Sequence, residues 1–238
     1  MILYGRNPVR EALRGRRGHA VGSIWATHGA ARETWLAGRK LQLVDAEEIE
    51  RRCGSSAHQG ICAQAGAYPY VSAEELLTVQ APLVVALDQI QDPQNLGSIC
   101  RTCECVAATG VVIPERRAAE VTPAVCKASA GAVEHLRVAR VRNVADFLAQ
   151  AREAGCWCYG ASAEETSMPY DAPDYRGGVV LVLGSEGRGL RPRVARACDA
   201  LISLPLHGRI ESLGVSAAAA AVLYEILQNR ARALDKAP

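Results

Sequence analysis

The stretch ISLPLHGRIESLGVSAAAAAVLYEI, residues 202–226, guides how the rest of the chain is interpreted. It joins a short apolar run to a helix of small residues through a loop that contains proline and glycines. Alanine favours helix and adds no bulk, so the alanines at 217–221 predict a helix that packs closely against a backbone or a ligand. Because Ser212 and Ser216 offer hydroxyl groups to the free amides of this helix, we expect a ligand-binding loop at its start.

Upstream of this stretch, apolar strands alternate with helices. Two of the strands are continuous apolar runs, LVVAL at 83–87 and VVLVL at 179–183. Such strands are typical of a parallel sheet with helices on both faces, whose ligands bind beyond the carboxyl ends of the strands. The predicted strands are residues 83–87, 110–113, 136–141, 156–161, 179–183 and 201–204, and the predicted helices are residues 96–108, 123–133, 144–154 and 192–197 and the alanine-rich helix.

The first 66 residues predict a separate small α/β unit. Helices are expected at 7–13 and 46–53, and strands at 23–27, 41–44 and 60–64. Residues 67–80, with a proline and few strong apolar residues, predict a linker that contains a short helix near 73–78. The expected organisation is therefore a small domain at 1–66, a linker at 67–80 and a larger domain at 81–238.

The cations of the chain are almost all arginines. The formal net charge is only +2, but 24 of the 27 basic residues are arginine. Guanidinium groups suit bidentate phosphate recognition, which favours a nucleic-acid partner, and a GC-rich genome would give the same bias. Before residue 40, only Glu11 and Glu33 oppose seven arginines, which predicts a polyanion-binding surface. These arginines are Arg6, Arg10, Arg14, Arg16, Arg17, Arg32 and Arg39.

The composition excludes several classes of protein. Hydrophobic residues make up 49% of the chain, enough for real cores, yet no apolar run reaches the roughly 18 residues that span a bilayer. Because the first residues also lack the apolar core of a signal peptide, we expect a cytoplasmic protein without a membrane partner. Nine cysteines then predict free thiols. Cys100, Cys103 and Cys105 resemble half of a zinc site, but no second pair matches them, so no metal is predicted.

Three strand ends carry unusual loops. They are DQIQDPQNLGSICRTCECVAATG at 88–110, LVLGSEGRGL at 181–190, and the loop at 204–216 that follows the last strand. The glycines of the second loop match neither the Walker motif nor the dinucleotide fingerprint. They are compatible with a structural turn, a small-molecule site or a phosphate site, and the carboxylate of Glu186 argues against the last.

Three segments of these loops closely resemble the three motifs of the SpoU/TrmH-type RNA ribose 2′-O-methyltransferases. The segments are DPQNLGSICRT, LVLGSEGRGL and ISLPLHGRIESLGVS, in this order. The N-terminal segments YGRNPVREAL and HQGICAQA look like the substrate-binding domain of the RlmB-type branch, which methylates a guanosine of 23S rRNA. The resemblance therefore covers nearly the whole chain.

This resemblance implies a fold, a cofactor and an assembly. The fold is an α/β fold of the SPOUT type, a parallel sheet flanked by helices with a C-terminal trefoil knot, preceded by a small L30e-like α/β domain. The cofactor is S-adenosylmethionine and the assembly is a homodimer that binds RNA, expected to be 23S rRNA. Carried over by position, the residues that line the cofactor pocket are Leu183, Gly184, Leu204 and Leu213.

The resemblance also implies the polar residues nearest the reaction, Asn95, Arg101, Glu186 and Ser212. An arginine has a pKa above about 12 and so almost never accepts a proton. Our hypothesis is that charged Arg101 binds the neighbouring phosphate and stabilises the developing alkoxide. Alternatively, Glu186 holds the turn of its own loop through backbone amides, and Ser212 is a helix cap. The expected RNA contacts are Arg6, Arg10, Arg14 and Arg188; the arginines at 188, 191, 193 and 196 either contact RNA or form a solvated helix face.

One position departs from the family. The third motif usually reads SLNVS, but this chain has glycine at 214, which keeps the turn and removes an amide donor and acceptor. The leading interpretation is a methyltransferase that acts on a guanosine ribose of 23S rRNA. The alternatives are the same chemistry on tRNA or another rRNA site, and an RNA-binding or ribosome-assembly factor with weakened catalysis.

Overall fold

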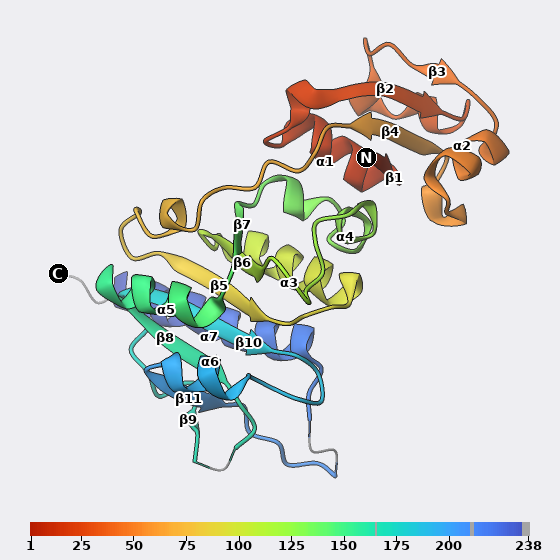
Figure 1. Cartoon of the computed structure of the whole chain (residues 1–238). Helices are drawn as coiled ribbons and strands as arrows, with labels where there is room; N and C mark the ends of the chain where they lie inside the picture. The colour runs from red at the N-terminus through yellow and green to blue at the C-terminus, as the bar shows by residue number, and fades with distance from the viewer. Residues whose placement is uncertain (165, 210–211, 235–238) are drawn as a thin grey trace.

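The computed structural model describes residues 1–164, 166–209 and 212–234, which form a smaller and a larger sheet (Figure 1). The smaller sheet has the strand order β1-β4-β2-β3 and the larger sheet has the order β7-β6-β5-β10-β8-β11-β9. The strands are β1 (Ile2–Tyr4), β2 (Val21–Ala26), β3 (Gln42–Leu43), β4 (Ile61–Ala65), β5 (Leu83–Asp88), β6 (Gly110–Pro114), β7 (Val138–Val141), β8 (Cys156–Ala161), β9 (Met168–Pro169), β10 (Gly178–Gly184) and β11 (Ala200–Ser203). The α-helices are α1 (Arg6–Arg14), α2 (Ala46–Cys53), α3 (Pro93–Cys105), α4 (Pro123–Ala128), α5 (Val144–Glu153), α6 (Pro192–Ala197) and α7 (Val215–Leu234).

The larger sheet is parallel at every pairing of its strands, as its uninterrupted apolar strands predict. Along β5, Leu83, Val85 and Leu87 join the buried cluster that contains residues of α3 and α7. Val84 and Ala86, which point to the opposite face, join the cluster that contains residues of α5 and α6. Both faces of the sheet are therefore buried, which explains why its strands are apolar throughout.

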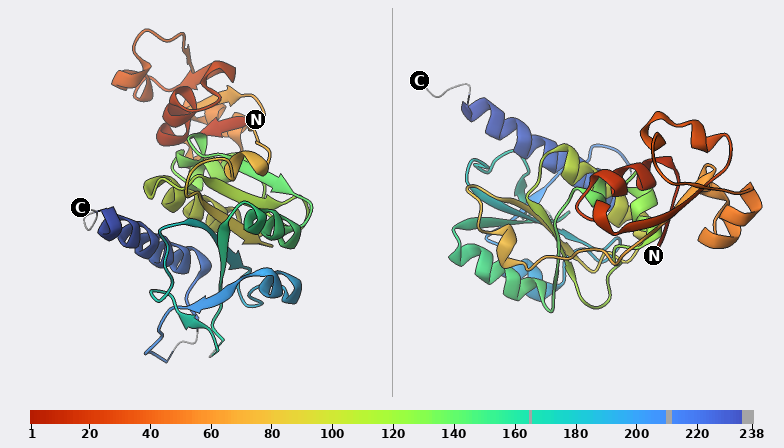
Figure 2. Two further views of the ribbon diagram at one scale, coloured as in Figure 1. Left: turned by 90° about the vertical axis from the view of Figure 1, so that its left-hand side faces the viewer. Right: turned by 90° about the horizontal axis from the view of Figure 1, so that it is seen from above.

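The smaller sheet stands at one end of the molecule, beside α3 and α4 (Figure 2). Its first strand, β1, was not predicted from the sequence; it pairs antiparallel with β4. Leu3 of β1 and Val9 of α1 belong to the same buried cluster as Ile99 of α3 and Val133. One continuous core therefore crosses the junction between the two sheets.

The helix predicted at 123–133 ends early. The α-helix α4 stops at Ala128, and a 3-10 turn follows at Ala132–Glu134. Ala130 and Gly131 between them have φ angles of 52° and 88°, which an α-helix cannot contain. Helix α3 begins earlier than predicted because Asp92 caps it, accepting a 2.9 Å hydrogen bond from the amide of Gln94, with proline in the first turn.

The segment at 67–80 packs against the larger sheet's domain. The hydroxyl of buried Tyr68 donates hydrogen bonds to the carbonyl oxygens of Val133 and Leu136, at 2.9 and 2.8 Å. Val71 forms a parallel bridge with Ala139 of β7. The helix predicted at 73–78 is a 3-10 turn at Glu74–Leu76. These contacts attach the segment along much of its length.

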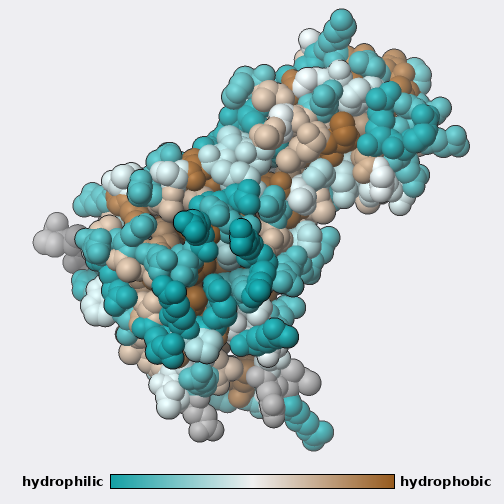
Figure 3. Space-filling view, viewed as in Figure 1, coloured by the Kyte–Doolittle hydropathy of each residue, from teal (hydrophilic) through white to brown (hydrophobic). Residues whose placement is uncertain are grey.

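Polar side chains cover most of the face that carries α5 and α6, and hydrophobic ones are scattered over it (Figure 3). This pattern fits two helices whose outer sides face solvent, with exposed residues such as Asp146, Arg193 and Arg196. No helix in the described ranges is both long and apolar enough to cross a membrane. The α/β fold is as predicted, and the trefoil knot that the resemblance implies stays a prediction.

Candidate active site

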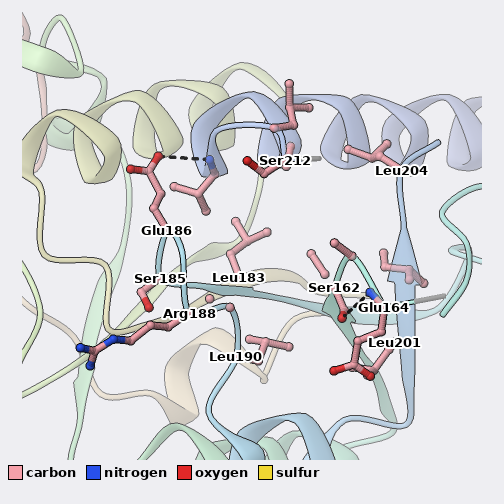
Figure 4. A pocket seen from close by; sticks show the side chains of 18 of the residues that line it. Ser162, Glu164, Leu183, Ser185, Glu186, Arg188, Leu190, Leu201, Leu204 and Ser212 are labelled. Carbon is pink, nitrogen blue, oxygen red and sulfur yellow. Dashed lines mark hydrogen bonds between the residues drawn. The ribbon is translucent and has the colours of Figure 1, made fainter. Parts of the chain in front are cut away.

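A cleft of about 520 Å³ opens at the carboxyl ends of the strands of the larger sheet, where a ligand was expected (Figure 4). We call it the strand-end cleft. Its walls come from the ends of β8, β10 and β11 with the residues that follow them, and from the start of α7. The second and third loops singled out in the sequence thus meet at one place.

All four predicted cofactor-binding residues line the strand-end cleft: Leu183, Gly184, Leu204 and Leu213. Leu183 is buried at the end of β10 and forms part of the floor, while Leu213 is 47% exposed at the rim. The wall is therefore mainly apolar, with polar contributions from loop backbone. Such a surface suits an organic ligand that is held by a few directed hydrogen bonds.

The loop after β10 is a closed turn. The amide of Ser185 donates to the carbonyl oxygen of Gly189 at 3.1 Å, and the amide of Gly189 donates back at 2.9 Å. A side chain at Gly184 would clash with the backbone of Gly189 and Leu190. Glycine is therefore required at 184 for close approach of two chain segments, and the turn presents backbone to the cleft.

A buried carboxylate anchors this turn. Asp88, at the end of β5, is fully buried and pairs in register with Gly184. Its two oxygens accept hydrogen bonds from the backbone amide of Arg191 at 2.9 Å and from its guanidinium Nε at 2.8 Å. Arg191 is thus occupied by Asp88, and neighbouring Arg193 pairs with Asp146 at 2.8 Å. Arg191 therefore has a structural partner, while the exposed pair of Arg193 fits the alternative of a solvated helix face.

Glu186 and Ser212 line the strand-end cleft, as predicted for two of the catalytic candidates. The Glu186 carboxylate accepts a 3.4 Å hydrogen bond from the amide of Val215, the first residue of α7. Glu186 therefore bonds to an amide of α7, which differs from the alternative in which it holds its own turn. A Cβ at Gly214 would lie 3.7 Å from the same carboxylate, so the position has room for a side chain.

One wall of the cleft was not predicted from the sequence. Ser162 and Glu164 follow β8 and line the cleft, with the Ser162 hydroxyl accepting a 3.2 Å hydrogen bond from the Glu164 amide. Leu190 and Leu201 complete the apolar wall. The sequence did contain one indication of this wall, because residues 156–161 were predicted as a strand of the parallel sheet and parallel strands end at the same edge. In the structure this strand, β8, lies between β10 and β11.

The other two catalytic candidates lie elsewhere. Arg101 is exposed on α3 and lines a second cleft of about 270 Å³, between α1, α3 and residues 129–135. We call this the interdomain cleft. Asn95 is half-buried in the first turns of α3 and is not among the described residues that line either cleft. Within one chain, the described residues therefore bring together only half of the predicted catalytic set.

The predicted RNA-binding arginines differ in their surroundings. Arg6 pairs with Glu33 at 2.7 Å, and Arg10 pairs with Glu11 at 2.6 Å while lining the interdomain cleft. Arg14 is more exposed and lies 4.0 Å from Glu11. The guanidinium of Arg188 points away from the strand-end cleft (Figure 4). Arg6, Arg10 and Arg14 thus lie on one helix of the smaller domain, and Arg188 lies in the larger domain.

Arg17 corrects the expectation of a uniformly basic surface, because its side chain is 2% exposed. Its Nε and Nη2 atoms donate to the carboxylate of Glu134 at 2.7 and 2.6 Å. Arg17 therefore pairs with Glu134 inside the fold and is too buried to contact RNA.

The cysteines are free thiols, as predicted. Burial raises the pKa of the Cys100 thiol to about 12 and that of the Cys103 thiol well above its usual value. Raised pKa values keep both thiols protonated, and only the thiolate form binds metal. Both cysteines therefore behave as small apolar side chains. Among the described residues, no group of three or more histidine, cysteine or acidic side chains is arranged to hold a metal ion.

Comparison with known proteins identifies the family. Residues 82–224 match the SpoU rRNA methylase family, and residues 2–71 match the family described as RNA 2′-O ribose methyltransferase substrate binding. The chain is 37% identical over 245 residues to the putative TrmH family tRNA/rRNA methyltransferase YacO of Bacillus subtilis strain 168, covering 96% of this chain and 95% of that protein.

Two solved structures share the fold. The SpoU methyltransferase AviRb from Streptomyces viridochromogenes, in complex with the cofactor AdoMet, superimposes with a TM-score of 0.82 at 23% identity over 97% of this chain and 90% of that chain. The AdoMet-bound rRNA methyltransferase from Sinorhizobium meliloti superimposes with a TM-score of 0.78 at 26% identity over 95% of this chain and 86% of that chain.

The chain belongs to the SpoU rRNA methylase family, a family of S-adenosylmethionine-dependent RNA methyltransferases. The predicted family, enzyme class and cofactor are thereby confirmed. The strand-end cleft fits this cofactor in volume, since ligand pockets span about 300 to 1,000 Å³. It also fits in chemistry, because leucines suit the adenine ring and two carboxylates, Glu164 and Glu186, suit the positive sulfonium and ammonium groups.

Proposed function

We propose that this enzyme methylates the ribose 2′-hydroxyl of a guanosine in 23S rRNA, in the cytoplasm. The observation that carries the proposal is the strand-end cleft, in which motif residues from two loops form a pocket of about 520 Å³, within the usual range for organic ligands. The match of residues 2–71 to a substrate-binding domain of RNA 2′-O ribose methyltransferases supports the ribose as the target. In this proposal residues 1–66 bind RNA, 67–80 connect, and 81–238 catalyse.

In this proposal, Leu183, Gly184, Leu204 and Leu213 hold S-adenosylmethionine, which when bound supplies an electrophilic methyl group on a sulfonium. The leucines exclude water from the reacting atoms, which strengthens the electrostatic effects of nearby charges. Ser212 stands at the polar edge of the cleft, where its hydroxyl can orient the substrate ribose. Glu186 joins the two loops through the amide of Val215 and so positions that edge.

The role proposed for Arg101 requires a second copy of the chain. Arg101 and the strand-end cleft belong to separate surfaces of one chain, so a homodimer that places Arg101 of one copy beside the cleft of the other would complete the site. An exposed apolar stripe on α7, with Tyr224 and Leu227, provides a face for such a dimer. Sedimentation equilibrium tests this: the wild type should be dimeric, and Tyr224→Glu should yield monomers that bind cofactor and lack methyl transfer.

Charged Arg101 then binds the phosphate beside the target and stabilises the alkoxide that develops on the attacking oxygen. Arg101→Lys separates two forms of this role. If lysine retains most activity, a point charge suffices; if activity falls and RNA binding persists, the geometry of the guanidinium is required. Arg101→Ala should lower the rate by on the order of 100-fold, as expected for loss of one group that stabilises developing charge.

The experiment that tests the proposed substrate is methylation of unmodified transcripts of 23S rRNA, 16S rRNA and tRNA with labelled S-adenosylmethionine, followed by mapping of the 2′-O-methyl position. A single guanosine in 23S rRNA is the expected result, and its loss from the RNA of cells that lack the gene would link it to this enzyme. Methylation of tRNA or of another rRNA position would replace the substrate assignment. Absence of S-adenosylmethionine binding in calorimetry would overturn the catalytic proposal.

A further inference from the structure

The interdomain cleft is built from both parts of the chain. The smaller sheet's helix α1 supplies one wall, and α3 with the segment after α4 supplies the other. The polar side chains that line it are Asn7, Arg10, Glu11, Arg101, Glu104, Ser129 and His135, beside the thiol of Cys105. Two arginines singled out for different reasons in the sequence, Arg10 for RNA binding and Arg101 for catalysis, therefore line the same space.

The two walls are locked together by a buried ion pair. Arg17 follows α1, and Glu134 precedes His135 of the opposite wall; their side chains are 2% and 0% exposed. Arg17 also donates from Nη1 to the carbonyl oxygen of Gly66 at 3.0 Å, and the amide of Arg16 donates to the carbonyl oxygen of Glu134 at 3.0 Å. Separating the walls would break these hydrogen bonds and open the apolar core that the two domains share, so the cleft is preformed.

The groups around the cleft suit a sugar-phosphate. Glu11 accepts a hydrogen bond from Nε of Arg10 at 2.6 Å and lies 2.9 Å from Nε2 of His135, which holds both side chains at the wall. Burial opposes the charged form of Glu11, but the bonds with His135 and Arg10 outweigh it and lower the pKa of this carboxyl. No carboxylate of the described residues forms an ion pair with Arg101, so its guanidinium is available to an incoming phosphate.

We propose that the interdomain cleft binds the ribose-phosphate of an RNA nucleotide next to the methylated one, with Asn7 and Arg10 acting as substrate-positioning residues beside Arg101. This inference rests on the proposed function. It adds that side chains of the N-terminal domain position the RNA in the interdomain cleft, beside Arg101. Because the cleft is preformed, it sets a fixed spacing between the bound nucleotide and the RNA held elsewhere on the N-terminal domain.

Matched variants of the N-terminal domain test the proposal. Arg10→Gln and Asn7→Ala alter the cleft, whereas Arg51→Gln removes the same charge from α2, at an exposed residue that pairs with Glu48 and is not among the lining residues. On the transcript that accepts the methyl group, both cleft variants should raise KM for RNA by roughly 10-fold, as expected for a lost bond to a charged group, while Arg51→Gln changes it less than about 3-fold. The dissociation constant for S-adenosylmethionine should be unchanged in all three. Equal effects of the cleft variants and Arg51→Gln would overturn the proposal.

A footprint on the wild-type enzyme is independent of any effect of substitution on folding. Cys105 is exposed and lines the cleft, while Cys53 on α2 is partly buried and lines neither cleft. Transcripts of 23S rRNA and tRNA should each be tested for protection of Cys105 from maleimide, with Cys53 as the reference and peptide mass spectrometry as the readout. Selective protection of Cys105 by RNA, and its absence with S-adenosylmethionine alone, supports the proposal. An unprotected Cys105 while filter binding shows RNA bound overturns it and leaves the proposed function standing; RNA that does not bind at all contradicts both.

Discussion

The strand-end cleft has an apolar wall of leucines and loop backbone within one sheet, whereas the interdomain cleft has a wall of charged side chains from two domains. The shape of the first depends on close approach of backbone segments at Gly184 and on the anchoring of a turn by Asp88. The shape of the second depends on one buried ion pair, between Arg17 and Glu134. Cofactor binding and RNA positioning are therefore separable by substitution: added volume affects the first cleft and lost charge affects the second.

The largest effect is expected at the buried ion pair. Arg17→Ala leaves the Glu134 carboxylate buried without a partner, which should lower the free energy of unfolding by about 3 to 5 kcal/mol. Arg6→Ala is the control, because it removes an exposed pair with Glu33 and should cost at most about 1 kcal/mol. Urea unfolding measures both, and a similar small cost for the two variants would show that Arg17 does not lock the interdomain cleft.

A smaller effect, and one confined to the strand-end cleft, is expected for Gly184→Ala. The added methyl group meets the backbone of Gly189 and Leu190, which should cost about 3 kcal/mol in overpacking or displace the turn. Calorimetry should then show an affinity for S-adenosylmethionine reduced by roughly 100-fold, with RNA binding retained. The control is Gly177→Ala, since a methyl group added at that residue would meet no atom within 4 Å. Unchanged cofactor binding in Gly184→Ala would contradict the assignment of this cleft.

Two arginines of one segment provide the next test. Arg191→Ala removes the side-chain partner of buried Asp88 and should cost about 2 kcal/mol, because the backbone amide of residue 191 still donates to that carboxylate. Arg193→Ala removes an exposed pair with Asp146 and should cost less than about 1 kcal/mol. Thermal unfolding and cofactor calorimetry measure the pair of variants. If both lose cofactor affinity equally, the anchoring of the turn by Asp88 is not what shapes the cleft.

The smallest effect on stability is expected for Gly214→Asn, which introduces the residue usual in the family. The nearest atom to the new Cβ is the Glu186 carboxylate at 3.7 Å, so the free energy of unfolding should change by less than about 0.5 kcal/mol. The added amide should raise the rate of methyl transfer several-fold without changing cofactor affinity, as expected for a group that acts mainly in the transition state. A rate equal to that of the wild type in a steady-state methylation assay would show that this chain does not need the amide.

The strand-end cleft was far more predictable from the sequence than the interdomain cleft, for a physical reason. The loops that carry the second and third motifs come at the ends of apolar strands, and parallel strands place their carboxyl ends at one edge, so the meeting of these loops follows from local pattern. The four residues Leu183, Gly184, Leu204 and Leu213 came from the resemblance to the family. Glu164 was missed although β8 ends at the same edge, because its loop carries no unusual residues. The pairing of Arg17 with Glu134 spans 117 residues, and no local pattern encodes which arginine of a basic segment finds a buried partner.

Local segments of the sequence were sufficient to specify the parallel α/β sheet, the positions of six of the seven strands that the described residues place in it, and the family, because hydrophobic periodicity and motif spacing are properties of such segments. The two-residue strand β9 was missed because it is too short to show a periodicity. The folded structure was needed to show that Arg101 lies apart from Glu186 and Ser212 and shares a cleft with Arg10. It was also needed to show that Arg17 is buried while Arg14 stays exposed. The reason is that burial and long-range pairing depend on which surfaces the two sheets present to each other, and that relation exists only once both have folded.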